Sequence, residues 1–123
     1  MTNKPVVLIA DDSSIARRGL KNRIDKDKYQ IIEAVGGNDA LEKIKFNKID
    51  CILLDLLMPD IDGFEVLEQL HNSNNQIPII IISADIQEST RNIVIEKGAF
   101  DFLNKPPLSD DLNDTLNRAL NRK

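Results

Sequence analysis

The sequence predicts an α/β protein built on a doubly wound, open parallel sheet of five strands. Five short apolar runs, most of them β-branched and continuous rather than alternating, have the pattern of strands that are covered on both faces. Helix-length stretches lie between these runs, and strands that alternate with helices require right-handed crossovers and helices on both faces of the sheet. Five βα units are too few to close an eight-fold barrel, so we expect an open sheet.

The five expected strands follow directly from the apolar runs. They are Val6–Ala10, Ile31–Val35, Cys51–Leu54, Ile79–Ile82 and Phe100–Leu103. Pro78 is expected to open the fourth strand, where the N–H that proline lacks is not needed.

The stretches between the strands carry apolar residues on one side of a 3.6-residue period, which predicts amphipathic helices. The apolar positions are Ile15, Gly19, Leu20 and Ile24, then Leu41 and Ile44, then Phe64, Leu67 and Leu70, and finally Leu112, Leu116, Ala119 and Leu120. We expect Asn38 and Ser109 to be N-caps and Gly98 to end the fourth helix. The third helix is expected to begin near Gly63 and to end in the polar segment 71–75.

Length and composition predict one globular domain over residues 1–123, because 41% of the residues are hydrophobic and 29% are charged. The net charge of −4 opposes nonspecific binding to nucleic acid or to an anionic membrane. No apolar run approaches the ~20 residues of a membrane span, and Asp11 interrupts the only candidate for the core of a signal peptide. With a single cysteine, Cys51, the sequence favours a cytoplasmic protein.

Polar residues stand immediately after four of the five expected strands. Asp11 and Asp12 follow the first strand, Asp55 the third, Ser83 the fourth and Lys105, after Asn104, the fifth. Ligands of open α/β sheets bind beyond the carboxyl ends of the strands. In the strand order 2-1-3-4-5 these four strands are neighbours, so their side chains are expected to meet in one crevice.

Three carboxylates that lie within a few ångströms destabilise a fold unless a positive charge intervenes, so we expect a divalent cation there. The available donors are hard oxygens, which select Mg²⁺ or Mn²⁺ over zinc. Because Mg²⁺ accepts one or two carboxylates together with phosphoryl oxygens, the site is expected to handle phosphoryl groups. Asp55 is central enough to be the nucleophile, with Asp11 and Asp12 on the metal and with Lys105 and Ser83 on phosphoryl oxygens.

Together these residues resemble the receiver domain of two-component response regulators. The resemblance rests on Asp11-Asp12-Ser13, on Asp55 followed by Met58-Pro59-Asp60-Ile61-Asp62-Gly63, and on Ser83-Ala84, Gly98-Ala99 and Lys105-Pro106. It implies a flavodoxin/CheY-like three-layer sandwich with strand order 2-1-3-4-5. It also implies one receiver domain over residues 1–123 with no output domain, acting as a switch that catalyses only its own phosphorylation and dephosphorylation.

The resemblance further implies a role for each site residue. Asp55 would accept the phosphoryl group, and Asp12, Asp55 and the backbone carbonyl of Leu57 would bind Mg²⁺. Asp11 would act on the metal directly or through a bound water. Ser83 and Lys105 would hold the phosphate, Ser83 and Phe102 would be switch residues, and the Lys105-Pro106 bond would be cis.

Leu57 and Asp85 fall two residues after Asp55 and Ser83, at positions where the family sets its rate of dephosphorylation. Leu57 cannot orient a water molecule by hydrogen bonding. We therefore expect a long-lived phosphorylated state, unless Asp85 takes over that role.

The implied partners are a sensor histidine kinase or a histidine phosphotransfer protein, and a downstream target protein. We expect no direct contact with nucleic acid, no membrane insertion, and a monomer or a phosphorylation-dependent dimer. The basic flank of the first helix is either a solvated face or a docking surface for an acidic partner; its residues are Arg17, Arg18, Lys21, Arg23, Lys26 and Lys28.

Three alternative functions share features with this sequence. One is a phosphorelay intermediate that passes the phosphoryl group to a histidine phosphotransfer protein. A haloacid-dehalogenase-type phosphatase would need an Asp-x-Asp spacing, whereas Asp11 and Asp12 are adjacent, and it would need a cap domain. A flavodoxin-like electron carrier is disfavoured because these two aspartates would repel the phosphate of FMN.

Overall fold

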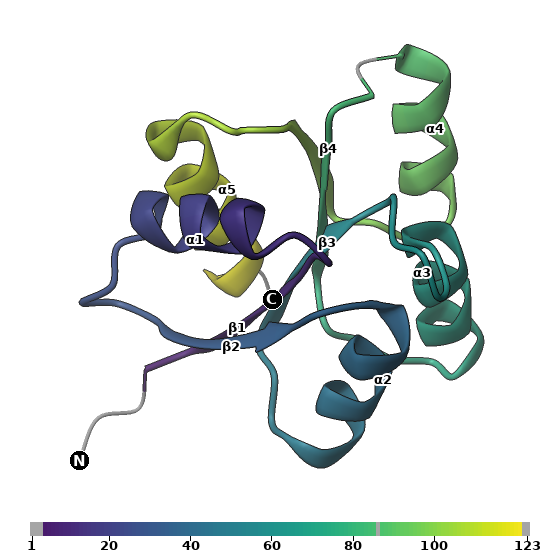
Figure 1. The fold of residues 1–123 in the computed structure, drawn as a ribbon, viewed down its shortest axis with the longest axis horizontal. Coiled ribbons are helices and arrows are strands. Elements are labelled where there is room, and N and C mark those ends of the chain that lie inside the picture. Colours follow the sequence, from purple (N-terminus) through teal and green to yellow (C-terminus); the bar gives the residue numbers. More distant parts are fainter. Residues whose placement is uncertain (1–3, 86, 122–123) are drawn as a thin grey trace.

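The computed structural model describes residues 4–85 and 87–121 of the chain. Five strands form one parallel sheet in the order β2-β1-β3-β4-β5, which confirms the predicted fold class (Figure 1). The strands are β1 (Val6–Ala10), β2 (Gln30–Ala34), β3 (Cys51–Asp55), β4 (Ile79–Ser83) and β5 (Asp101–Asn104). The second and fifth strands are thus offset by one residue from the apolar runs that predicted them.

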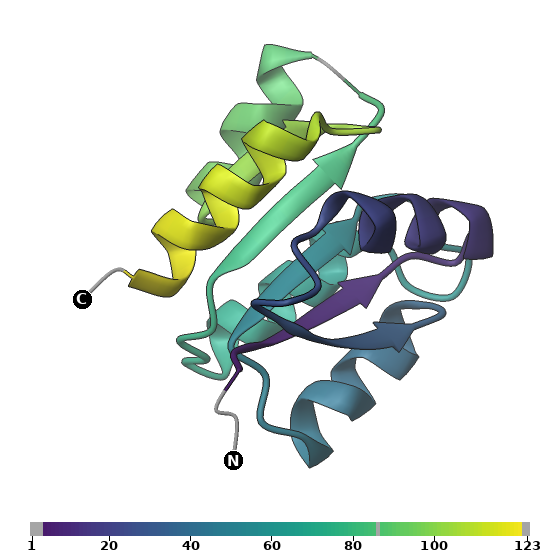
Figure 2. The same cartoon turned by 90° about the vertical axis from the view of Figure 1, so that its left-hand side faces the viewer.

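In the residues that the structure describes, five helices cover the two faces of the sheet, α1 and α5 on one face and α2, α3 and α4 on the other (Figures 1 and 2). They are α1 (Ser14–Arg23), α2 (Gly37–Phe46), α3 (Gly63–Asn72), α4 (Glu88–Glu96) and α5 (Ser109–Asn121). Within the described part of the chain, every helix is too short or too polar to cross a lipid bilayer.

The sheet separates two hydrophobic cores. Alternate residues of the central strands face opposite sides, so Leu54 packs in the core beneath α2, α3 and α4, and Leu53 packs in the core beneath α1 and α5. All residues of β3 and β4 are buried, as expected for parallel strands with helices on both faces. Since each buried Leu or Ile contributes about 1.5–3 kcal/mol, these strands form a rigid base for the residues that follow them.

The predicted N-cap at Asn38 is wrong, because α2 begins at Gly37 and its N-cap is Gly36. Glycine has no side chain with which to cap the helix. The first backbone N–H groups of α2 instead donate to the carboxylate of Asp60, which lies in the loop between β3 and α3. The cap of this helix therefore comes from a distant segment, which a local sequence pattern cannot reveal.

The predicted N-cap at Ser109 is off by one residue. α5 begins at Ser109, and the first helical hydrogen bond runs from the N–H of Leu112 to the carbonyl of Leu108. Gly98 does follow α4 as predicted, with a φ of 106° that an L side chain rarely adopts. Likewise, α3 begins at Gly63 and ends at Asn72, as the sequence pattern indicated.

Candidate functional site

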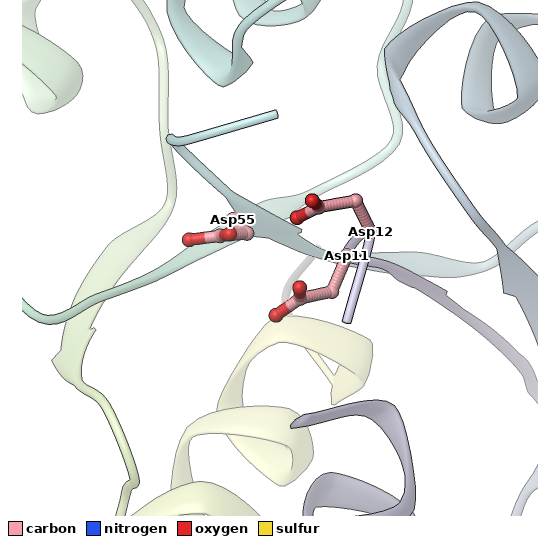
Figure 3. A group of neighbouring side chains, drawn as sticks. All are labelled: Asp11, Asp12 and Asp55. Carbon is pink, nitrogen blue, oxygen red and sulfur yellow. The ribbon is translucent and has the colours of Figure 1, made fainter. Parts of the chain in front are cut away.

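Three carboxylates meet at the carboxyl ends of β1 and β3 (Figure 3). One oxygen each of Asp11, Asp12 and Asp55 lies within 4.8 Å of the other two. The strand register explains this meeting, because Ala10 pairs with Leu54 and the residues that follow these two must emerge side by side. Asp11 and Asp55 are only 2% and 6% exposed, whereas Asp12 is exposed to solvent.

Lys105 provides the positive charge of the cluster. Its Nζ lies 2.8 Å from Oδ2 of Asp11 and 3.3 Å from Oδ2 of Asp55. The backbone N–H of Lys105 donates to the carbonyl of Ser83, which ties the β5–α5 loop to the end of β4, and the Lys105-Pro106 bond is cis. Three carboxylates and one ammonium leave a formal charge of −2 at the strand ends.

The charges of the cluster are held in an environment that disfavours them. Burial raises the pKa of Asp55, the negative charge of Asp11 raises it further, and Lys105 and the N–H of Leu57 only partly offset these effects. Burial opposes the charged form of Lys105, but its hydrogen bond to Asp11 and the charges of Asp55 and Asp11 outweigh burial and raise its pKa. An additional cation at this site would relieve the excess negative charge.

The donor set fits a hard divalent cation, because the oxygens of Asp11, Asp12 and Asp55 are carboxylate oxygens. The three residues are not equally available. In Asp11, Oδ1 accepts the N–H of Ser13 at 2.9 Å and Oδ2 accepts Lys105. Asp55 also contacts Lys105 through Oδ2, whereas Asp12 is the exposed member of the three.

Ser83 ends β4 and is 3% exposed. Its Oγ accepts the backbone N–H of Asp85 at 3.1 Å. This bond uses the oxygen as an acceptor and leaves the hydroxyl proton available to donate to an anion.

The carboxylate of Asp85 faces the first turn of α4 rather than the carboxylate cluster. One oxygen accepts the hydroxyl of Thr90 at 2.6 Å, and the other accepts the N–H of Gln87 at 3.0 Å. These two bonds lower the pKa of Asp85. The arrangement connects Ser83, through Asp85, to the beginning of α4.

Leu57 is exposed to solvent, whereas Phe102 is buried. Leu57 is 77% exposed beside the cluster, and its backbone N–H acts to lower the pKa of Asp55. Phe102 is 6% exposed and packs in the core beneath α2, α3 and α4, while its carbonyl accepts Arg91 from α4 at 3.4 Å.

Sequence reasoning gave no individual role to Arg17, which the structure places next to the site. Its guanidinium donates to the backbone carbonyl of Asp11 at 2.8 Å and pairs with Glu33 of β2 at 2.9 Å. Lys21 also pairs with Glu33, at 2.9 Å. Two members of the basic flank of α1 are thus bound within the chain.

Comparisons with known proteins show which family the chain belongs to. A family model described as the response regulator receiver domain matches residues 7–117. The chain belongs to that family, and its fold is that of a CheY-like receiver domain.

Two curated relatives illustrate the sequence similarity. The alkaline phosphatase synthesis transcriptional regulatory protein PhoP of Bacillus subtilis is 32% identical over 98% of this chain and 50% of the relative. The transcriptional regulatory protein SrrA of Staphylococcus aureus is 39% identical over 81% of this chain and 41% of the relative. The chain therefore spans about half the length of these relatives or less.

Solved structures of similar size show the same fold. The Francisella response regulator 1452 receiver domain matches with a TM-score of 0.89 and 31% identity, over 95% of this chain and 97% of that one. The signal receiver domain of a putative LuxO repressor protein from Vibrio parahaemolyticus matches with a TM-score of 0.90 and 32% identity, over 95% of this chain and 90% of that one.

Proposed function

We propose that this chain is a phospho-accepting switch of a two-component system, in which Asp55 accepts a phosphoryl group from a phosphohistidine. The donor is a sensor histidine kinase or a histidine phosphotransfer protein. The observation that carries the proposal is the position of Asp55, which is buried at the end of a central strand with Lys105 at 3.3 Å and two further carboxylates beside it.

The chemistry requires a positioned carboxylate and neutralisation of phosphoryl charge. An oxygen of Asp55 attacks phosphorus, and the new P–O bond forms as the P–N bond to the histidine breaks. The bonding electron pair leaves with the imidazole nitrogen. The product is an acyl phosphate on Asp55, which adds negative charge to a cluster that already has an excess of it.

Two side chains of the domain are suited to hold the transferred group. Lys105 already contacts Asp55, so its ammonium is in reach of an oxygen on the phosphoryl group. Ser83 has a free hydroxyl proton to donate to a second oxygen. Asp12, Asp55 and the backbone carbonyl of Leu57 would hold Mg²⁺, with Asp11 acting directly or through water, and Mg²⁺ would neutralise charge on the phosphoryl oxygens.

The output is a change in affinity for a target protein. A phosphoryl group that draws the hydroxyl of Ser83 toward it moves the oxygen that accepts the N–H of Asp85, and Asp85 is in turn bound to the first turn of α4. This movement favours one of two conformations of α4, β5 and α5. Arg91, whose guanidinium donates to the carbonyl of the buried Phe102, links α4 to β5 and belongs to the surface that responds.

The proposal is tested by incubation with acetyl phosphate in Mg²⁺ or in EDTA, followed by mass measurement of the intact protein. The wild-type chain should gain one phosphoryl group only in the presence of Mg²⁺, and Asp55→Asn should gain none. Asp62→Asn, which removes a carboxylate from the same loop but not from the cluster, should behave as wild type. Labelling of Asp55→Asn to the wild-type level would exclude the proposal.

A further inference from the structure

The loop between β3 and α3 is fastened at its outer end by Asp60. One oxygen of its carboxylate accepts the N–H of Gly37 at 3.0 Å, and the other accepts the N–H of Asn38 at 2.9 Å. Both donors are at the beginning of α2, and these bonds are among the causes that lower the pKa of Asp60. A single exposed side chain thus joins this loop to a helix more than twenty residues earlier in the sequence.

The loop and the helix also fit closely at their backbones. A Cβ atom on Gly37 would lie 2.3 Å from Cγ1 of Ile61 and 2.5 Å from the carbonyl oxygen of Ile61, and real Cβ atoms do not approach so closely. A Cβ atom on Gly36 would lie 3.0 Å from the carboxylate of Asp60. The two glycines therefore permit the loop to reach the helix, and Asp60 holds it there.

The same loop carries the peptide that contacts the acceptor carboxylate. The backbone N–H of Leu57 lies near enough to the carboxylate of Asp55 to lower its pKa, and Leu57 is 77% exposed, so its side chain does not anchor it in the core. At its inner end the loop is closed by a hydrogen bond of 2.9 Å from the N–H of Gly63 to the carbonyl of Leu56. Leu57 therefore lies between the inner closure and the attachment through Asp60.

The helix that receives Asp60 is itself fixed to the sheet. Ala40 of α2 is fully buried in the core beneath α2, α3 and α4, and its N–H donates to the carbonyl of Gly36 at 2.9 Å. The start of α2 is thus a fixed point against which the loop can be held.

We infer that Asp60 is a positioning residue of the phosphoryl site, because its bonds to Gly37 and Asn38 hold the Leu57 peptide against Asp55. The inference deepens the proposed function and rests on it for the metal. When Mg²⁺ binds, the carbonyl of Leu57, which belongs to the next peptide unit, is one of its proposed ligands, so the position of the Leu57 backbone sets the affinity. Residues that orient metal ligands typically change metal affinity by about tenfold to a hundredfold when they are removed.

The experiment compares Asp60→Ala with a matched control, Asp62→Ala. Asp62 is an exposed carboxylate in the same loop that caps α3 by accepting the N–H of Glu65 at 2.9 Å. Both variants lose one negative charge and one helix cap, but only Asp60→Ala releases the loop from α2. Gly37→Ala releases it from the other side by pushing Ile61 away, and Asp60→Asn keeps a carbonyl oxygen as acceptor.

Two measurements on the folded variants decide the outcome. In magnesium-free buffer, hydrogen exchange of the Leu57 amide should accelerate in Asp60→Ala and Gly37→Ala but not in Asp62→Ala. In a calorimetric titration with Mg²⁺, the dissociation constant should rise about tenfold in Asp60→Ala and Gly37→Ala, less in Asp60→Asn, and not at all in Asp62→Ala.

The inference would be overturned if the Leu57 amide exchanged at the same rate in Asp60→Ala and in the wild type. It would also be overturned if Asp60→Ala and Asp62→Ala lost the same amount of Mg²⁺ affinity, because that result would indicate only a general effect of loop stability. A wild-type chain that binds no Mg²⁺ would instead refute the metal site of the proposed function. The exchange rates would still decide the role of Asp60 in that case.

Discussion

Replacing Asp55 with asparagine is expected to stabilise the folded chain in magnesium-free buffer at neutral pH. At a separation of about 4.8 Å and an effective dielectric constant of ~20, each repulsion between Asp55 and another carboxylate of the cluster costs about 3.5 kcal/mol. The attraction to Lys105 at 3.3 Å contributes about 5 kcal/mol on the same scale. Solvent weakens the repulsion from the exposed Asp12, but desolvation of Asp55 acts against the ionised carboxylate as well. We expect the free energy of unfolding to rise by about 1–2 kcal/mol.

The higher stability of Asp55→Asn relative to the wild type should disappear when the pH is lowered or when Mg²⁺ is added. Because the pKa of Asp55 is raised in the folded state, its ionisation costs stability as the pH rises through that value, and the difference between Asp55→Asn and the wild type should close as the pH falls toward the unfolded value of about 3.9. At a Mg²⁺ concentration of about ten times the dissociation constant, the wild type gains about 1.4 kcal/mol that the variant lacks.

Urea unfolding of both proteins, in EDTA and in Mg²⁺ and across a pH series, measures these differences. Asp114→Asn is the control, because it also removes one negative charge but lies on the exposed face of α5 beside Arg118. Its stability should change little and should not depend on Mg²⁺. If Asp55→Asn is less stable than the wild type in EDTA at neutral pH, the electrostatic account of the cluster is wrong.

Three other predictions follow from the same geometry. Lys105→Met should lower the free energy of unfolding by about 2 kcal/mol in EDTA, because Asp11 and Asp55 lose their counter-charge, and urea unfolding with Mg²⁺ should show a smaller loss. The phosphorylated wild type should lose its phosphoryl group slowly, and phosphorylated Leu57→Asn should lose it faster, as measured by the mass of the intact protein over time. Loss within seconds in the wild type would contradict this expectation. Gly63→Ala should cost about 3 kcal/mol in thermal or urea unfolding, since its Cβ would lie 2.4 Å from the Asp55 carbonyl oxygen, and a wild-type stability would contradict the close approach.

The sheet and the cluster at its edge could be predicted from the sequence because both follow from short-range patterns. Continuous β-branched runs identify buried parallel strands, and the residue that follows each run must lie at the same edge of the sheet. This logic identified Asp11, Asp12, Asp55 and Lys105 as neighbours, and the structure brings them together.

The features that the sequence did not reveal depend on where loops pack. Asn38 has the residue type of an N-cap, but the helix begins two residues earlier than this predicts, because the carboxylate of Asp60 supplies acceptors from another loop. The sequence also does not predict which group the carboxylate of Asp85 faces. Its bond to Thr90 depends on the path of the chain into α4. Local residue preferences do not encode either contact.

Identification of the modified residue tests the central claim most directly. The wild-type chain is phosphorylated in Mg²⁺, reduced with borohydride, which converts an acyl phosphate to an alcohol, and digested for peptide mass spectrometry. We predict that the reduced residue is Asp55 and that omission of Mg²⁺ abolishes the product. A stable modification on another residue, or none on Asp55 when the chain is folded and Mg²⁺ is present, would contradict the account.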